Sequence, residues 1–268
     1  MSIKVAVIQM AVAEGNLTAN EKKAIAMVRQ AAEAGAELVV LPELWNSGYQ
    51  LEQLAQFAAP VLENTSLKKM KALAKEFGIY LVAGSVATRK EDCYYNTAIT
   101  FDHNGDIIGK YNKIHLFPLG LREDQYFAGG DDFCLVESPW GKLGIVLCYD
   151  LRFPALCRNL ALQGANILVV PAQFPKARIR HWQILNQARA IENQCFVVAA
   201  NVTGKMDSPY CGSSMIISPW GEILAQGDER EQILYSELDL EEISKVRKTI
   251  PVFQQRKAIL DEIDDTRW

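Results

Sequence analysis

The chain has 268 residues, of which 49% are apolar and 22% charged, and it carries a formal net charge of −4. This composition provides enough apolar material for a large core, so it excludes a disordered chain, a coiled coil and a collagen-like repeat. The acidic balance also excludes a general nucleic-acid binder, which would carry a basic surface.

Strands and helices alternate along the first half of the chain. Residues 5–8 predict a buried strand, and a helix is expected over residues 21–34, with Asn20 as its N-cap and Gly35 at its end. The continuous apolar run at 38–41 predicts a strand covered on both faces. The other elements of this half are a helix at 66–77, a strand at 79–86, and an antiparallel pair at 96–101 and 107–111 around Asn104-Gly105.

The second half repeats this pattern, and we expect one domain over residues 1–268. Two echoes connect the halves: residues 35–42 resemble residues 164–171, and Ser-Pro-Trp-Gly occurs at 138–141 and at 218–221. Two similar βαβ-containing halves would explain these echoes, and the ordinary repetition of strand and turn sequences is the alternative. The predicted strands lie at 143–147, 167–170, 196–199, 215–217 and 223–225, and the helices at 154–162 and 179–192.

The cysteines and the apolar runs bear on the cellular compartment. The six cysteines form no CxxC pair, so we expect no structural zinc site and expect reduced thiols in a cytoplasmic protein. The N-terminal apolar run is interrupted by Lys4 and stops at Gln9, which is too short for a signal peptide. Since no run approaches about 18 apolar residues, no membrane span is expected.

Two polar residues follow predicted strands, at the edge where open α/β sheets bind ligands. Cys148 lies between a strand and a helix that has Pro154 in its first turn, and a helix N-terminus favours a thiolate. An inert buried cysteine is the alternative. Glu43 follows the strand at 38–41, where a desolvated carboxylate can accept a proton, or can serve as a helix cap or an ion-pair partner.

A lysine among apolar neighbours follows the second strand of the hairpin. Lys113 is flanked by Ile114 and Leu116, and it could offer a positive donor to an oxyanion or be an ordinary surface lysine. His115 could act as a general base, and a histidine satisfied within a packed strand end is the alternative.

Together, three blocks of the sequence resemble the carbon–nitrogen hydrolase family, the nitrilase superfamily. The blocks are Leu-Pro-Glu-Leu-Trp-Asn-Ser-Gly-Tyr at 41–49, Tyr-Asn-Lys-Ile-His-Leu-Phe at 111–117 and Leu-Cys-Tyr-Asp-Leu-Arg-Phe-Pro at 147–154, in the order of the family. Residues 187–193 and Asn201 also match. The resemblance runs from about Lys4 to the region of Leu238, and it implies an α/β fold, an α-β-β-α four-layer sandwich of two similar halves with mixed sheets.

The resemblance also implies a chemistry. The family hydrolyses non-peptide C–N bonds with a Glu-Lys-Cys triad, and the matching positions here are Glu43, Lys113 and Cys148. Cys148 would give its proton to Glu43 and attack the substrate carbonyl, ammonia would leave, and the resulting thioester would be hydrolysed. Lys113 and the backbone N–H of Tyr149 would stabilise the oxyanion. No metal and no organic cofactor is implied.

Amidases of the family often carry a second glutamate after the lysine. Glu123 is the candidate, Asp124 is its competitor, and a solvated charged loop is the alternative. Asn112 stands where many relatives carry arginine, which leaves the lysine assignment intact but would change a neighbouring ion pair.

Two arginines suggest the class of substrate. Arg152 follows the nucleophile by one helical turn and Arg178 is expected on a loop after a strand, and a guanidinium binds a carboxylate bidentately. The predicted substrate therefore carries a carboxylate and a primary amide, as for omega-amidases, which act on monoamides of dicarboxylic acids such as 2-oxoglutaramate. Alternatively, Arg152 only fixes its loop through Asp150. The residues expected to bind substrate are Tyr49, Tyr149, Arg152 and Phe174.

Other functions remain open on the same sequence. A nitrilase, an N-carbamoyl amide hydrolase and an amidase acting on deaminated glutathione share the triad. A non-catalytic scaffold is a different class, and the intact triad argues against it. A redox-sensing thiol protein would use Cys148 with Cys157 as its partner.

The expected partner is a small-molecule amide, with no nucleic acid and no membrane. Family members usually form homodimers or larger homo-oligomers, and residues 239–268 form a C-terminal extension expected to contribute to that contact. Its apolar segment 250–253 could serve the contact or pack on the chain's own core, and the charged tail at 261–267 is expected at the surface, together with residues 260–263.

Overall fold

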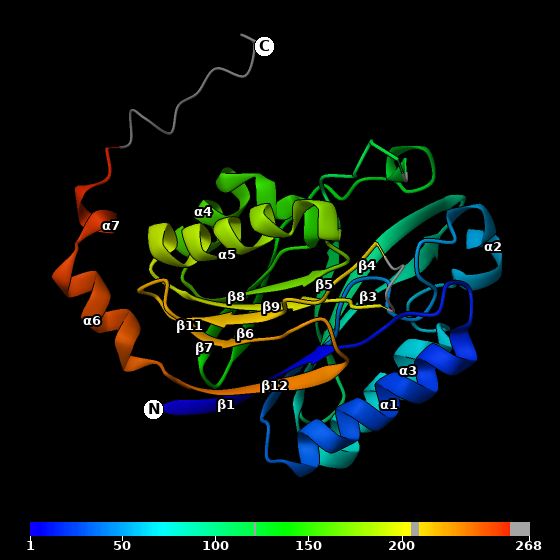
Figure 1. Cartoon of the computed structure of the whole chain (residues 1–268), viewed down its shortest axis with the longest axis horizontal. Coiled ribbons are helices and arrows are strands. Elements are labelled where there is room, and N and C mark those ends of the chain that lie inside the picture. The colour runs from blue at the N-terminus through cyan, green and yellow to red at the C-terminus, as the bar shows by residue number, and fades with distance from the viewer. Residues whose placement is uncertain (121, 205–208, 258–268) are drawn as a thin grey trace, which may run out of the picture.

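Two six-stranded sheets lie face to face between two layers of helices in the computed structural model, which describes residues 1–120, 122–204 and 209–257 (Figure 1). The strands of the first sheet, in spatial order, are β12 (Gln232–Asp239), β1 (Ser2–Gln9), β2 (Leu38–Val40), β3 (Tyr80–Lys90), β4 (Cys93–Phe101) and β5 (Ile107–Asn112). Those of the second sheet are β11 (Ile223–Gln226), β10 (Met215–Ile217), β9 (Phe196–Asn201), β8 (Ala165–Ala172), β7 (Gly141–Ile145) and β6 (Cys134–Ser138).

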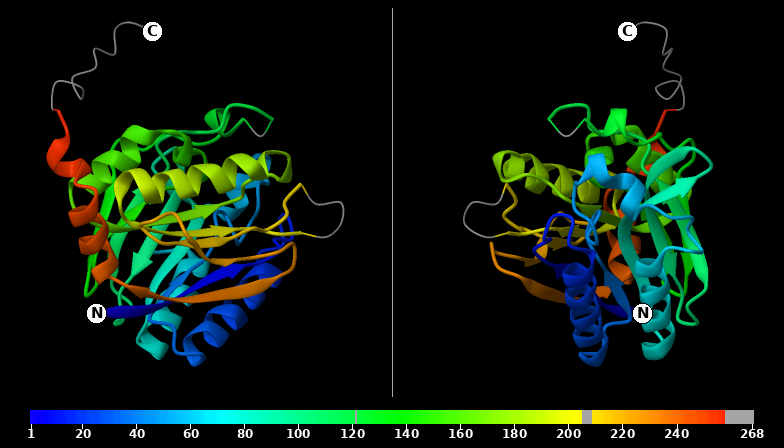
Figure 2. Two further views of the ribbon diagram at one scale, coloured as in Figure 1. Left: turned by 60° about the vertical axis from the view of Figure 1, so that its left-hand side comes forward. Right: turned by 90° about the vertical axis from the view of Figure 1, so that its right-hand side faces the viewer.

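Helices cover the outer face of each sheet. The helices α1 (Leu17–Glu33) and α3 (Thr65–Phe77) pack on the first sheet, and α4 (Pro154–Leu162) and α5 (Ile179–Asn193) pack on the second (Figure 2). The predicted α-β-β-α sandwich with mixed sheets is therefore confirmed. The shorter helices are α2 (Leu54–Phe57), α6 (Glu241–Thr249) and α7 (Val252–Gln255).

Three apolar layers hold the four structural layers together. Leu38 and Val40 of β2 face the central layer between the sheets, whereas Val39 faces the helices, because successive side chains of a strand point to opposite faces. A strand covered on both faces is apolar throughout, as the run at 38–41 predicted. The outer layers contain Ala24, Val39 and Met70 on one side and Leu160, Leu168 and Ala190 on the other.

The two sheets have the same internal organisation. In each, three parallel strands, β1-β2-β3 or β7-β8-β9, carry one antiparallel strand on one side and an antiparallel pair on the other. The first sequence echo is explained by this arrangement, because residues 35–42 contain β2 and residues 164–171 contain most of β8, the middle parallel strand of each sheet.

The second echo does not relate the two halves, and that part of the prediction is wrong. Both Ser-Pro-Trp-Gly segments are hairpin turns of the second sheet, one between β6 and β7 and the other between β10 and β11. In both turns the serine hydroxyl accepts a hydrogen bond from the backbone N–H of the tryptophan, at 3.3 Å in the first turn and 3.2 Å in the second. The glycines close both turns with positive φ, +97° at Gly141 and +83° at Gly221, so a shared turn chemistry explains the repeat.

The N-terminus of α1 also differs from the prediction. The helix begins at Leu17, and its N-cap is Asn16, whose side chain accepts a hydrogen bond from the Ala19 N–H at 3.1 Å. Asn20 lies inside the helix instead. Its buried side chain amide bonds to the backbone of Ala13 and Asn46, so it fixes the loops beside the helix rather than its first turn.

The remaining predicted elements are confirmed within a few residues, and the helix at 154–162 has the predicted bounds. The hairpin at 96–101 and 107–111 is β4 with β5. The prediction missed the strands β6 and β12 and the helices α2, α6 and α7. The strand β12 pairs with β1 at the other end of the chain, a partner that local sequence cannot show.

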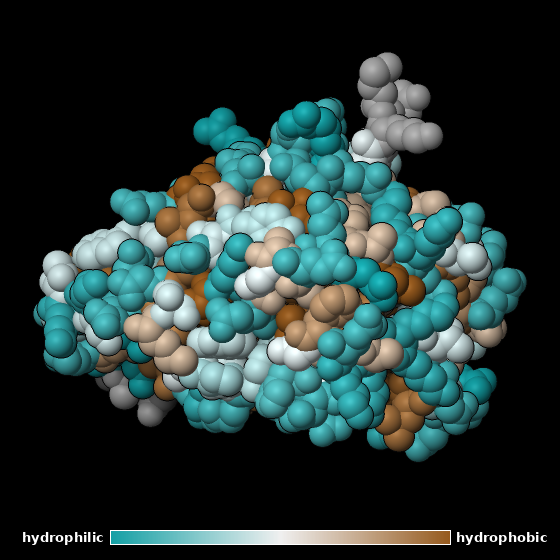
Figure 3. Space-filling view, turned by 90° about the horizontal axis from the view of Figure 1, so that it is seen from below, coloured by the Kyte–Doolittle hydropathy of each residue, from teal (hydrophilic) through white to brown (hydrophobic). Residues whose placement is uncertain are grey.

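Hydrophilic residues dominate the face shown in Figure 3, and apolar residues lie in scattered groups. Ile250 and Val252 are exposed, so within the described residues this part of 250–253 does not pack on the chain's own core. The predicted tail at 261–267 and residues 260–263 lie outside the described residues. Among those described, no helix has the length and apolarity to cross a bilayer.

Candidate active site

Glu43, Lys113 and Cys148 meet where strands of both sheets end. Glu43 follows β2 by three residues, Cys148 follows β7 by three residues, and Lys113 directly follows β5. The Lys113 Nζ lies 2.8 Å from Glu43 Oε1, and Cys148 is close enough to this pair for the charges of both side chains to act on its thiol. The three predicted catalytic residues are therefore brought together at one place.

The backbone before Glu43 is held against β3. Gly84 has φ +55°, and a Cβ at this position would lie 1.9 Å from the carbonyl oxygen of Pro42. The next residue, Ser85, donates its N–H to that oxygen at 3.2 Å and accepts the N–H of Leu44 on its hydroxyl at 2.9 Å. These contacts fix the chain on both sides of Glu43, and they need glycine at 84.

A second carboxylate holds the other side of the ammonium. Glu123 accepts hydrogen bonds from Lys113 Nζ at 2.7 Å and 3.0 Å, and also accepts the Phe117 N–H at 2.7 Å. Glu123 is fully buried, whereas Asp124 is exposed and pairs with Arg122 at 3.4 Å. The geometry therefore favours Glu123 over Asp124 as the second carboxylate.

Two residues that the sequence reasoning missed hold Glu43 in place. Asn96 donates its amide to Glu43 Oε1 at 2.9 Å, and Gln173 donates its backbone N–H to Oε2 at 3.0 Å. The side chain of Gln173 also donates to the backbone carbonyl of Glu43 at 2.8 Å. Gln173 comes directly after β8, so the signal that identified Glu43, a polar residue after a buried strand, could also have identified Gln173.

Cys148 begins a 3₁₀ turn, η3 (Cys148–Arg152), that leads into α4. Its φ is +45°, a region that residues other than glycine rarely adopt. Asp150 of this turn accepts hydrogen bonds from both the backbone N–H and the ring Nδ1 of His115, at 2.8 Å and 2.7 Å. His115 is thus bound to this turn through its backbone and one ring nitrogen, as expected for the histidine satisfied at a packed strand end, and it does not line the cavity.

Burial and charge set the protonation of the site. Burial and the nearby Glu43 carboxylate raise the pKa of the Cys148 thiol well above its ordinary value, so the thiol is protonated at neutral pH. Burial alone would lower the pKa of Lys113, but the charges of Glu123 and Glu43 outweigh it and raise that pKa. Burial likewise raises the pKa of Glu123, against the opposing effect of Lys113. The site therefore pairs a neutral thiol with a fixed cation.

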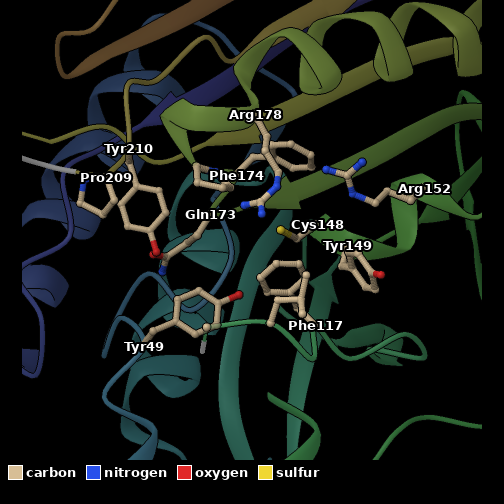
Figure 4. A pocket seen from close by; sticks show the side chains of 13 residues that line it. Tyr49, Phe117, Cys148, Tyr149, Arg152, Gln173, Phe174, Arg178, Pro209 and Tyr210 are labelled. Carbon is tan, nitrogen blue, oxygen red and sulfur yellow. The ribbon is translucent and has the colours of Figure 1, made fainter. Parts of the chain in front are cut away.

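A cavity of about 310 Å³ opens onto Cys148 (Figure 4). Arg152 contacts this cavity from η3, and Arg178 contacts it from a second 3₁₀ turn, η4 (Lys176–Arg178), where a loop had been predicted. Within the described part of the chain, no salt bridge involves either guanidinium. The four predicted substrate-binding residues, Tyr49, Tyr149, Arg152 and Phe174, all line the cavity.

The side chain of Arg152 does not fix its loop through Asp150. Its Nη1 lies 3.3 Å from His181 Nδ1, and its guanidinium lies over the ring of Phe174, 5.2 Å from the ring centre. Arg178 lies in the same way over Phe117, at 5.7 Å. Both cations are thus supported by aromatic faces at the cavity wall and are available to a bound anion.

The arrangement suits nucleophilic acyl chemistry. A protonated thiol lies beside a carboxylate that can accept its proton, and the ammonium paired with that carboxylate is a donor that could stabilise negative charge on a substrate oxygen. The residues described include no cluster of three or more His, Cys, Asp or Glu side chains suited to a metal ion.

Comparison with known proteins gives a consistent result. A family model described as carbon-nitrogen hydrolase matches residues 4–248. The chain is 41% identical over 255 residues to a 2-oxoglutaramate amidase of Bacillus subtilis, covering 94% of this chain and 97% of the relative. It is 33% identical over 272 residues to the omega-amidase NIT2 of Homo sapiens, with 98% of each covered. The crystal structure of Saccharomyces cerevisiae Nit3, of the nitrilase superfamily, superposes with a TM-score of 0.87 at 32% identity, covering 100% of this chain and 97% of Nit3.

Proposed function

The chain belongs to the carbon–nitrogen hydrolase family and is a hydrolase of carbon–nitrogen bonds, and from this premise we propose that it is an omega-amidase. The proposed reaction releases ammonia from the terminal amide of a dicarboxylic acid monoamide, such as 2-oxoglutaramate, and leaves the dicarboxylic acid. The observation that carries the proposal is the fully buried ion pair of Lys113 with Glu43 beside the Cys148 thiol, on a cavity that also presents two arginines.

In the first half of the reaction Cys148 forms an acyl-enzyme. Glu43 accepts the thiol proton as the sulfur attacks the amide carbon, and the C=O electron pair moves to oxygen. Lys113 and the backbone N–H of Tyr149 stabilise that oxyanion. The proton then passes from Glu43 to the amide nitrogen, the C–N bond breaks, and ammonia leaves a thioester on Cys148. Because burial keeps the free thiol protonated, this proton transfer has to accompany the attack.

In the second half water replaces ammonia. Glu43 takes a proton from a water molecule, whose oxygen attacks the thioester carbon and forms a second oxyanion at the same donors. The C–S bond breaks, the sulfur takes the proton back, and the carboxylic acid is released. Glu123 keeps Lys113 oriented through both halves, since it holds the ammonium with two hydrogen bonds.

The carboxylate of the substrate, at the end opposite the amide, is proposed to bind the cavity arginines. Arg178 and Arg152 both line the cavity and lie over aromatic rings, and a guanidinium in that position can donate two parallel hydrogen bonds to a carboxylate. A substrate with an amide at one end and a carboxylate at the other fits this distribution of charge. The names of the relatives, an omega-amidase and a 2-oxoglutaramate amidase, support the same class.

A substrate panel tests the proposal. Ammonia release is measured with 2-oxoglutaramate and succinamate, with N-carbamoyl compounds, with simple nitriles and with uncharged short amides. We expect the two monoamides to give the highest kcat/KM. Mass spectrometry of the quenched enzyme should show an acyl adduct on Cys148 and none in Cys148→Ala. Faster turnover of nitriles or N-carbamoyl compounds would replace the omega-amidase assignment by one of the two other activities of this triad.

We also propose a homo-oligomer in a reducing compartment, the cytoplasm. All six cysteines are free thiols, which fits reducing conditions.

The exposed apolar residues Ile250 and Val252, near the end of the described chain, fit a contact with a second subunit. Sedimentation of the purified chain with Ile250→Ser beside the unchanged chain tests the contact, and we expect dissociation in the variant.

A further inference from the structure

The lysine of the site lies between two residues that both contact the nucleophile turn. Tyr111 lies in β5, Lys113 directly follows that strand, and His115 lies in the bend at residues 114–115. Lys113 contacts the two catalytic-site carboxylates, whereas Tyr111 and His115 both contact Asp150. One short segment therefore supports the ion pair and the turn of Cys148 at once.

The contacts with Asp150 are short and direct. The Tyr111 hydroxyl donates to Oδ2 at 2.7 Å, and His115 donates to Oδ1 from its backbone N–H at 2.8 Å. The His115 Nδ1 lies 2.7 Å from the same oxygen, and because a carboxylate only accepts, Nδ1 carries a proton. The ring is kept in this orientation by stacking on Phe153, with ring centres 3.5 Å apart and planes 7° apart.

Asp150 transmits these contacts to the nucleophile. It lies two residues after Cys148, is fully buried, and also accepts the Leu147 N–H on Oδ2 at 3.2 Å. The carboxylate of Asp150 thus binds the backbone of Leu147, the residue directly before Cys148. A buried carboxylate with four donors is fully satisfied, so the turn has little freedom to move relative to β5.

The backbone at Cys148 explains why such support is needed. A φ of +45° at a residue other than glycine persists only where the surrounding structure holds it. Arg189 of α5 supports the turn from the other side, since its Nε and Nη2 donate to the Leu151 carbonyl at 3.1 Å and 2.8 Å. The turn is therefore held from two directions, by β5 and by α5.

We propose that Tyr111 and His115 are positioning residues that act through Asp150 to set the Cys148 sulfur against the Lys113–Glu43 pair. They touch neither the reacting atoms nor the cavity among the described contacts. The inference concerns the proposed hydrolysis and rests on it, but its geometric content, the placement of the thiol, holds for any chemistry at Cys148.

Two variants test this role, with kcat, KM and the rate of Cys148 alkylation by iodoacetamide as readouts. Tyr111→Phe removes only the hydroxyl, and His115→Ala removes the ring. We expect each to lower kcat about 10- to 100-fold with KM changed less than about twofold, because small misplacements of reacting groups cost rate rather than affinity. The alkylation rate should fall in parallel. His115→Asn should recover most of the loss, since its side chain amide can donate near the position of Nδ1.

The controls separate positioning from folding and from the reaction itself. His103→Ala and Tyr235→Phe change a histidine and a tyrosine far from the site and should keep both rates. A variant whose melting temperature falls while kcat per folded enzyme and the alkylation rate stay at the unchanged chain's values would show a merely structural role and overturn the inference. If no substrate is turned over by the unchanged chain, the proposed function fails, while the alkylation rates still decide the placement of the thiol.

Discussion

The ammonium of Lys113 lies 2.8 Å from Oε1 of Glu43, and neither side chain has any exposed surface. Two charges removed from water stabilise a fold only if each stays paired, because the cost of leaving one buried charge alone exceeds the gain from the pair. The third member, Glu123, is a second buried carboxylate that contacts the same ammonium.

Removal of Lys113 should therefore affect both stability and turnover. Lys113→Met leaves two buried carboxylates without their cation, and we expect the free energy of unfolding to fall by about 3–5 kcal/mol. Loss of the oxyanion donor should lower kcat at least about 10²-fold. Urea unfolding and ammonia release measure the two effects.

The matched control is Lys110→Met, which changes an exposed lysine of β5, the strand that Lys113 directly follows. We expect it to keep the activity and the unfolding midpoint of the unchanged chain. If Lys113→Met were as stable as this control, the buried pair would not hold the site together in the way the distances indicate.

Glu123 and its neighbour Asp124 give a second comparison. Glu123→Gln keeps the shape of the side chain but removes its charge, and we expect kcat to fall about 10²-fold because Lys113 loses half of its support. Asp124→Asn changes an exposed residue and should leave kcat within about twofold. The two kcat values are measured side by side with one substrate, and equal losses would contradict the assignment of Glu123.

Much of the site could be predicted because its residues carry local signals. Glu43 and Cys148 each follow an apolar strand, and motif blocks around them and around Lys113 match a known family. Asn96 carries no such signal, since it is one of several polar residues within a strand, and its role depends on a carboxylate 53 positions away.

The fold shows the same division between local and long-range information. The helix at 154–162 has a proline at its start and an apolar stripe, so its bounds follow from its own sequence. Asn16 and Asn20 are equally good N-caps on local grounds, and the choice is made by Asn46, which binds the side chain of Asn20 from a distant loop. Likewise, β12 pairs with β1 at the other end of the chain, so this strand depends on a partner that its own sequence does not show.

The backbone at Cys148 yields a stability prediction. Cys148→Ala and Cys148→Gly both remove the sulfur, but only glycine adopts positive φ without cost. We therefore expect the glycine variant to be more stable than the alanine variant by about 1 kcal/mol, although both should lack turnover.

The matched control uses Cys157, which lies in α4 and has ordinary helical backbone. There Cys157→Gly should be less stable than Cys157→Ala by about 1 kcal/mol. Urea unfolding of the four variants checks both signs, and the same sign at both positions would contradict the argument.

Buried thiols predict a loss of stability at alkaline pH. Burial raises the pKa of Cys134 to about 11 and those of Cys157 and Cys195 to about 12. Below about pH 9 the folded and unfolded chains hold these protons alike, so the stabilisation is fully present there. Between that value and the folded pKa only the unfolded chain loses them, and the free energy of unfolding should fall by about 1.4 kcal/mol per pH unit for each thiol.

The slope of stability against pH between 9 and 11 measures this effect. Cys195→Ala should make the slope less steep by the share of one thiol, about 1.4 kcal/mol per pH unit. Cys93→Ala removes an exposed thiol and should keep the slope of the unchanged chain. An unchanged slope in Cys195→Ala would show that this thiol loses its proton at a similar pH in the folded and unfolded chains.

The two arginines that line the cavity predict how kcat/KM depends on the charge of the substrate. Arg178→Gln keeps a hydrogen-bonding side chain but removes the positive charge that faces the cavity, and a charge-assisted contact of this kind is worth about 1.5–3 kcal/mol. We therefore expect kcat/KM for succinamate to fall about 10- to 100-fold, mainly through KM, while kcat/KM for an uncharged amide such as butyramide changes less than about threefold.

Arg180→Gln, at an exposed position of α5, is the matched control and should change kcat/KM for neither substrate. Measuring ammonia release for both substrates with Arg152→Gln in parallel then shows which guanidinium binds the carboxylate. If both arginine variants lose the charged and the uncharged substrate equally, the arginines shape the cavity without recognising the carboxylate.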